Sequence, residues 1–66
     1  MNITINSQSK DLAEGIKLAE AVALFAQRPE VVVAELNGAI VDRQRWSDTA
    51  LSEGDRVELV TFVGGG

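Results

Sequence analysis

The glycines that end the sequence, Gly64, Gly65 and Gly66, are the residues best suited to chemistry. Glycine loses more conformational entropy on ordering than any other residue and adds no side chain to a core, so three in a row contribute nothing to folding. They are either an idle end or a chain that threads a channel too narrow for Cβ atoms. Extended from Val63, they reach roughly 13 Å, which would place the Gly66 carboxylate inside another protein's active site.

The composition excludes most other chemistry. The 66 residues contain no Cys and no His, so thiolate nucleophiles, the commonest general base and the usual transition-metal ligands are missing, and we expect neither autonomous catalysis nor a metal site. Ten acidic and six basic side chains give a net charge of -4, the wrong sign for a nucleic-acid partner. No apolar run reaches the roughly 20 residues that span a bilayer, and no signal-peptide pattern begins the sequence. We therefore expect a soluble cytoplasmic protein without membrane contact.

The first half of the sequence predicts a hairpin and a helix. Apolar and polar residues alternate over residues 1–5, which is the period of a half-buried strand. Residues 7–9 are turn formers, and residues 10–13 are expected to return as a short antiparallel strand. Good helix formers with an apolar stripe at helical spacing predict a helix over residues 18–27, which Pro29 should end.

The second half predicts another hairpin and a last strand. Residues 31–36 and 39–41 are rich in strand formers, and Asn37-Gly38 between them suits the two positive-φ positions of a type I′ turn. After an irregular crossing, the β-rich residues 56–63 close the chain. The expected fold class is α+β, a mixed β-sheet packed on one main helix.

The last predicted strand has apolar residues on both of its faces. If Val57 and Leu59 face the helix, then Val60 and Phe62 lie on the open side of the sheet, which would mark a partner-docking surface beside the glycines. Negative charge on the same side would steer a basic partner. The alternative is that the extra valines serve β-propensity alone. The residues assigned to this docking surface are Val33, Glu58, Val60, Phe62 and Val63.

Other conspicuous residues have structural or solvation roles in this interpretation. Trp46 is the only Trp and is expected to pack over the edge of the core. Arg43 and Arg45 beside it are expected to be solvated charges rather than partner contacts. Four acidic residues lack the spacing of a metal loop and are expected to serve solubility and steering: Asp48, Glu53, Asp55 and Glu58.

A family resemblance covers the whole chain. Residues 37–46, NGAIVDRQRW, resemble the NG-x-x-V-x-R-x-x-W stretch of the thiamine biosynthesis sulfur carriers, the ThiS family, and Phe62-Val63-Gly64 resembles that family's approach to its last glycines. The resemblance implies a ubiquitin-like β-grasp domain over residues 1–63. It also implies a flexible reactive tail over residues 64–66.

The resemblance further implies a carrier rather than an enzyme, with no cofactor of its own. In that family an E1-like adenylyltransferase uses ATP and magnesium to convert the terminal carboxylate, here on Gly66, to an acyl-adenylate. Sulfur from a cysteine-derived persulfide donor then displaces AMP, and thiazole synthase takes the sulfur from the resulting thiocarboxylate.

Three alternatives accompany this interpretation. The small subunit of molybdopterin synthase shares the fold and the di-glycine end, but it usually approaches its glycines through Pro-Pro-Val, which Thr61-Phe62-Val63 does not match. A ubiquitin-like protein modifier would form isopeptide bonds, and the tail does not distinguish it. A purely structural β-grasp module would leave the glycines unexplained.

Overall fold

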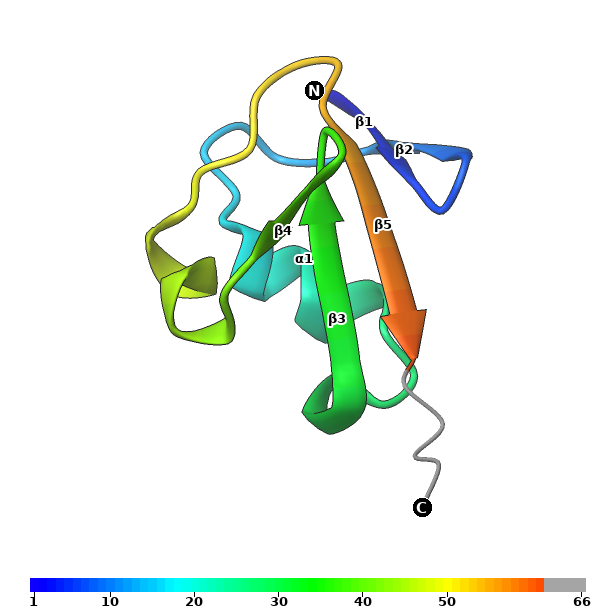
Figure 1. The fold of residues 1–66 in the computed structure, drawn as a ribbon. Coiled ribbons are helices and arrows are strands. Elements are labelled where there is room, and N and C mark those ends of the chain that lie inside the picture. The colour runs from blue at the N-terminus through cyan, green and yellow to red at the C-terminus, as the bar shows by residue number, and fades with distance from the viewer. Residues whose placement is uncertain (62–66) are drawn as a thin grey trace.

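The computed structural model describes residues 1–61, in which one helix packs on one face of a five-stranded mixed sheet (Figure 1). The strand order is β2-β1-β5-β3-β4, with β1 and β5 parallel and the other neighbours antiparallel. This confirms the predicted succession of two strands, a helix, two strands, a crossing and a last strand. The elements are β1 (Asn2–Ile5), β2 (Gln8–Asp11), α1 (Leu18–Phe25), β3 (Val32–Leu36), β4 (Ala39–Val41) and β5 (Arg56–Thr61), with the 3₁₀ turns η1 (Pro29–Val31) and η2 (Arg43–Asp48).

The first hairpin turns earlier than the sequence predicted. Asn6 and Ser7 both have positive φ values, 50° and 68°, as the central positions of a type I′ turn require. β2 therefore begins at Gln8, where a turn was expected, and the predicted strand over residues 10–13 was wrong by two residues at each end. Asn tolerates this backbone region well, but Ser has no special preference for it, so the sequence alone pointed elsewhere.

Helix α1 presents the apolar stripe that its sequence predicted. It begins after Lys17, whose backbone N–H donates a hydrogen bond to Glu20 Oε1 at 2.9 Å and so gains a partner within the first turn. The helix ends at Phe25, before the predicted residue 27, because Ala26 is already extended ahead of Pro29. Its buried residues are Leu18, Ala21 and Val22.

The second hairpin pairs with the last strand, β5, which is the central strand of the sheet. Asn37 and Gly38 have φ values of 52° and 88°, which confirms the predicted type I′ turn. β5 lies between β1 and β3, with Leu59 opposite Ala34 in the antiparallel register. Val31, predicted to start the preceding strand, belongs instead to η1.

The core fills the space between α1 and the sheet. Trp46 is 7% exposed and closes one side of it, as predicted, while its indole N–H donates a hydrogen bond to the Val41 carbonyl oxygen at 2.9 Å. Apolar side chains at alternating strand positions supply most of the remainder, which is why the period-two pattern identified them. The buried strand residues are Ile3, Ile5, Val32, Ala34, Val57 and Leu59.

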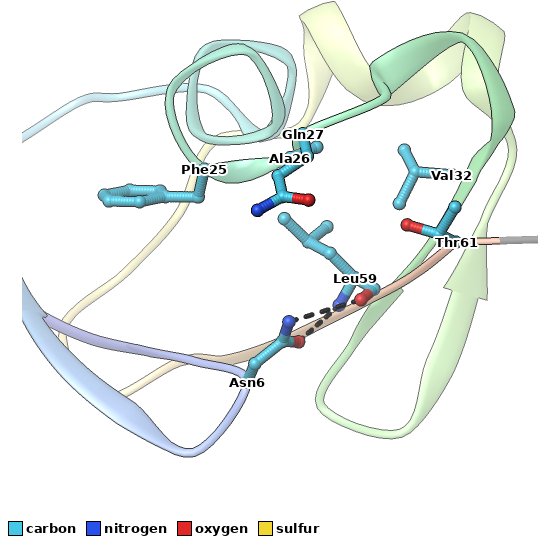
Figure 2. A pocket seen from close by; sticks show the side chains of 7 residues that line it. All are labelled: Asn6, Phe25, Ala26, Gln27, Val32, Leu59 and Thr61. Atoms are coloured by element: carbon cyan, nitrogen blue, oxygen red, sulfur yellow. Dashed lines mark hydrogen bonds between the residues drawn. The ribbon is translucent and has the colours of Figure 1, made fainter.

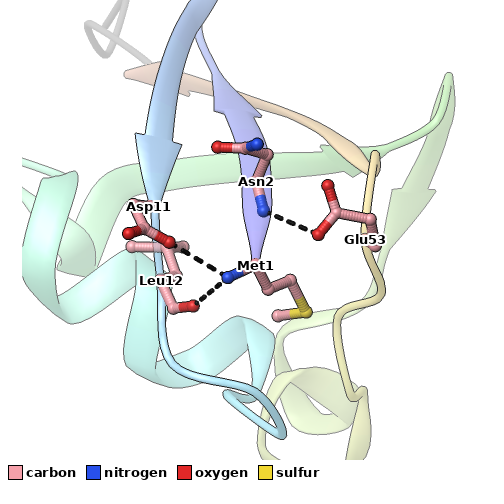
Figure 3. A network of polar contacts seen from close by, with 5 residues as sticks. All are labelled: Met1, Asn2, Asp11, Leu12 and Glu53. Atoms are coloured by element: carbon pink, nitrogen blue, oxygen red, sulfur yellow. Dashed lines mark hydrogen bonds and ion pairs between the residues drawn. The ribbon is translucent and has the colours of Figure 1, made fainter.

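A polar network fixes the start of β1 (Figure 3). The α-amino group of Met1 donates hydrogen bonds to Asp11 Oδ1 at 3.0 Å and to the Leu12 carbonyl oxygen at 2.9 Å. The hydrogen bond to the Asp11 side chain is the main cause that raises the pKa of this amine above its ordinary 8.0. The Asn2 N–H donates to Glu53 Oε1 at 2.9 Å, so Glu53 has a structural contact beyond the steering role expected of it.

Candidate functional site

β5 carries the candidate site, because this strand leads into the glycines at the end of the sequence. Val57 and Leu59 are buried in the core, whereas Glu58 and Val60 face the opposite, open side of the sheet. Val60 is 51% exposed, which is unusual for a large apolar residue in the middle of a sheet. The structure thus confirms the predicted faces of this strand.

An apolar patch, called here the sheet patch, lies on the open face and consists of Val33, Ile40 and Val60. Val33 on β3 is directly opposite Val60, and Ile40 on the edge strand β4 is 68% exposed. Val33 itself is half-buried. Sequence reasoning missed Ile40, although the two-residue turn was a signal for it. That turn sets Ile40 opposite Glu35, and so on the same face as Val33.

Negative charge borders the sheet patch. Glu58 lies directly opposite Glu35 in the β3–β5 register, and Arg56 precedes it on the same face; all three line one shallow hollow. Within residues 1–61 neither glutamate forms a salt bridge. Like charges in opposite positions weaken a sheet slightly, so this pair does not serve stability. The sequence identified Glu58 but not Glu35, because strand order was needed to pair them.

The start of β5 is fixed by Asn37 and Asp55. Asn37 Nδ2 donates a hydrogen bond to Asp55 Oδ1 at 3.0 Å, and the Ser52 N–H donates to Asp55 Oδ2 at 2.7 Å. Asn37 Oδ1 accepts a hydrogen bond from the Arg56 N–H at 2.9 Å. Asp55 is therefore a turn-forming residue rather than a free steering charge. Asn37 forms its own turn and also holds the first residue of β5, Arg56.

The other end of β5 borders a cavity of about 270 Å³ between the first hairpin turn and the end of α1 (Figure 2). Asn6 reaches from that turn to β5 and contacts both backbone polar atoms of Leu59. The Leu59 N–H donates to Asn6 Oδ1 at 2.7 Å, and Asn6 Nδ2 donates to the Leu59 carbonyl oxygen at 3.3 Å. Sequence reasoning missed this contact. The lining residues are Asn6, Phe25, Ala26, Gln27, Val32, Leu59 and Thr61.

Arg43 is exposed, as expected of a solvated charge, but its guanidinium also contacts the backbone of the sheet edge. Its guanidinium lies over the Trp46 ring, 4.5 Å from the centroid. β4 pairs with β3 only as far as Ala34 opposite Val41, and Arg43 occupies the edge beyond that point. The guanidinium donates hydrogen bonds of 2.9, 3.2 and 3.2 Å to the carbonyl oxygens of Pro29, Glu30 and Val32.

Replacing Arg43 with Met is expected to lower the free energy of unfolding by about 1–2 kcal/mol, because charge-assisted hydrogen bonds and a cation–π contact are lost together. Urea unfolding of the purified protein measures this. Arg45→Met is the matched control, since the Arg45 guanidinium donates no hydrogen bond to another residue within 1–61; it should change stability by less than about 0.5 kcal/mol. Equal unfolding midpoints for the two variants would contradict the role assigned to Arg43.

The remaining predicted site residues lie outside the described residues, as does the predicted boundary between the domain and the tail. Their roles stay predictions. Among residues 1–61, no group of three His, Cys, Asp or Glu side chains could hold a metal ion. None of the described helices is long and apolar enough to cross a membrane. The site residues concerned are Phe62, Val63, Gly64, Gly65 and Gly66.

Comparison with known proteins links this chain to one family. The model of the ThiS family matches residues 3–66. The sulfur carrier protein ThiS of Escherichia coli (strain K12) is 29% identical over 66 residues, which are 100% of both chains. A thiazole synthase of Magnetococcus marinus is 33% identical over 66 residues. The crystal structure of the thiamine biosynthesis protein ThiS from Geobacter metallireducens has a TM-score of 0.87 at 36% identity and covers 100% of both chains.

These likenesses differ in how much of the other protein they cover. The chain spans only 20% of the length of the thiazole synthases that it matches. By contrast, the Geobacter metallireducens structure has the same mixed sheet and helix over its full length, which confirms the predicted β-grasp fold. The family match also extends to residue 66, and so includes the glycines to which the sequence assigned the chemistry.

Proposed function

The chain belongs to the ThiS family of sulfur carriers in thiamine biosynthesis, and we propose that it holds the sulfur as a thiocarboxylate on Gly66. It is a carrier rather than an enzyme. The observation that carries the proposal is the family match that continues through the glycines to residue 66. The molybdopterin synthase subunit and the protein modifier are not favoured, because the family model, a curated relative and a solved structure all bear the ThiS name.

A carboxylate needs activation before sulfur can enter it, since it is a poor electrophile without a good leaving group. We infer that an E1-like adenylyltransferase supplies this step with ATP and magnesium held in its own site. The Gly66 carboxylate oxygen attacks the α-phosphorus, and pyrophosphate leaves. The outer sulfur of a cysteine-derived persulfide then attacks the acyl carbon and displaces AMP. A second thiol then attacks the cysteine sulfur of this acyl persulfide, forms a disulfide with it, and releases the thiocarboxylate on Gly66.

The composition of the chain agrees with a mechanism in which partner enzymes supply the reacting groups other than the Gly66 carboxylate. With no Cys and no His, the carrier has no side chain that would act as the sulfur nucleophile or as a base near neutral pH. What it offers is a carboxylate that follows residues without Cβ atoms and can approach reacting groups closely. The partners must therefore provide all other reacting groups.

A thiazole synthase is the partner that we propose as the acceptor of the sulfur. In two thiazole synthases, of Magnetococcus marinus and Paramagnetospirillum magneticum, a stretch similar to all of this chain forms 20% of a longer polypeptide. Covalent linkage keeps two modules at high effective concentration, which favours modules that act on one another. This arrangement supports a working contact between the carrier domain and the synthase.

The sheet patch is the proposed docking surface for these partners. Exposed apolar side chains on neighbouring strands are typical of interface cores, and Val60 of this patch lies on the strand that leads to Gly66. Phe62 and Val63 follow Thr61 in the sequence and remain proposed members of the surface. Docking there would place a partner's active site within reach of the glycines.

Replacing Glu58 with Gln is expected to slow association with the adenylyltransferase about threefold at low salt, because complementary charge acts mainly on the association rate. Stopped-flow mixing at increasing salt measures this. The difference should vanish near 1 M salt, where the Debye length is about 3 Å. Glu14→Gln makes the same charge change in the loop before α1 and should leave the rate unaltered. A rate that is flat in salt, or equal for Glu58→Gln and the parent, would mean that the charge serves solubility alone.

Adenylation tests the activation step of this function. The purified full chain, an E1-like adenylyltransferase of a ThiS system, ATP and magnesium are expected to exchange labelled pyrophosphate into ATP, and the exchange should require the carrier. Carrier-independent exchange, or none at saturating carrier, would contradict the proposal that Gly66 is adenylated.

A further inference from the structure

Two asparagines hold the two ends of β5 in the same way. Asn37 and Asn6 each occupy the first central position of a type I′ turn, with φ values of 52° and 50°. Asn37 accepts a hydrogen bond from the backbone of Arg56 at the start of the strand, and Asn6 accepts one from Leu59 near its end. Asn6 additionally donates to the Leu59 carbonyl oxygen, so its amide closes a ring with that residue.

The end of β5 needs such a contact because its neighbour on one side stops early. β1 ends at Ile5, and the last backbone hydrogen bond on this side runs from the Asn6 N–H to the Val57 carbonyl oxygen at 2.9 Å. Beyond it the Leu59 N–H and C=O would face the cavity unpaired. The Asn6 side chain imitates the next residue of a strand and satisfies both groups (Figure 2).

Within residues 1–61, the Asn6 contact is therefore the last hydrogen bond that β5 makes on the β1 side. On the other side, β3 pairing ends with Val32 opposite Thr61. Toward α1 there is the cavity rather than a packed wall, since Phe25 and Gln27 line it without filling it. The direction of the chain at Thr61 thus depends on β3 from one side and on one amide from the other.

We propose that Asn6 is a positioning residue for sulfur loading: its clamp on Leu59 fixes the end of β5 near Thr61 and so helps to align Gly66 with the reacting groups of the adenylyltransferase. This inference rests on the proposed function. It assigns Asn6 no contact with substrate and no chemical step. A misplacement of a reacting group by about 1 Å can slow a reaction about a hundredfold. Loss of the Asn6 hydrogen bonds should therefore lower the rate of adenylation more than the affinity for the adenylyltransferase.

The structure provides a matched pair of variants, Asn6→Gly and Asn37→Gly. Glycine accepts a positive φ without strain, so each substitution removes an amide clamp and leaves the turn geometry accessible. Both variants lose hydrogen bonds to β5, one near the glycines and one at the far end of the strand. A general loss of stability would therefore affect both alike.

Amide hydrogen exchange, followed by NMR on the free full chain, tests the clamp without any partner. Asn6→Gly should speed exchange of the Leu59 N–H at least about fivefold, the order expected for one lost hydrogen bond. In Asn37→Gly the amide that speeds up should be that of Arg56. Unchanged exchange at Leu59 in Asn6→Gly would overturn the clamp itself.

Kinetics of pyrophosphate exchange then test the role in loading. Asn6→Gly should lower kcat about tenfold with KM for the carrier nearly unchanged, whereas Asn37→Gly should match the parent in both. Equal kcat values for the parent and Asn6→Gly, or equal losses in both variants, would overturn this inference alone. A parent chain that is never adenylated would instead overturn the proposed function and the role of Asn6 with it.

Discussion

Deleting Gly66, or replacing Gly65 with Val, is expected to lower the rate of adenylation at least about a hundredfold. The deletion moves the terminal carboxylate back by about 3.3 Å, and a displacement of even about 1 Å can cost a hundredfold in rate. The Val side chain acts differently, because it adds a Cβ and two methyl groups where the channel is expected to admit only backbone. Pyrophosphate exchange with an E1-like adenylyltransferase measures both effects.

The same variants should fold like the parent. Among residues 1–61 every buried core residue lies between Ile3 and Leu59, and glycine has no side chain to add to that core. Urea midpoints equal to that of the parent are the expected control. Unchanged exchange with the truncated chain would contradict the sulfur-carrier mechanism, and loss of folding would show that the glycines are structural.

Replacing Val60 with Lys is expected to weaken binding to the adenylyltransferase or the thiazole synthase at least about thirtyfold, equivalent to about 2 kcal/mol. A lysine in the sheet patch must either be desolvated in the complex or force the partner away. A basic partner would also repel its positive charge. Titration calorimetry of the variant with the purified partner measures the loss. Val60 is exposed in the free protein, so its stability should change by less than about 0.5 kcal/mol.

Leu24→Lys is the matched control for this substitution. Leu24 is also a large exposed apolar residue, at 65%, but it lies on α1, on the other side of the sheet from the patch. Partner affinity should therefore stay at the level of the parent. Equal affinities for Val60→Lys and Leu24→Lys would mean that the open face is not the docking surface.

Features with a local period or a local turn signal could be predicted from the sequence. The alternation around Val57 and Leu59 gave the correct faces of β5, and the Asn37-Gly38 pair gave the second hairpin. Trp46 was placed correctly because a single large aromatic in a small domain has few alternatives to the core edge. In each case the physical cause acts between residues close together in the chain.

Features that depend on strand order could not be predicted in this way. Asn6 and Leu59 are separated by 53 positions, and only the parallel pairing of β1 with β5 brings them together. Glu35 lies opposite Glu58 only because β3 pairs with β5. The backbone contacts of Arg43 could not be predicted, because its carbonyl partners become an open edge only once β4 stops short of them.

The mass of the C-terminal peptide tests sulfur carriage most directly. The full chain is incubated with an E1-like adenylyltransferase, ATP, magnesium and a persulfide donor, and the peptide that contains Gly66 is then measured. A gain of about 16 Da, the difference between one sulfur and one oxygen atom, is the predicted result of converting a carboxylate to a thiocarboxylate. An unchanged mass, or recovery of Gly66 only in an isopeptide bond to a lysine, would contradict it.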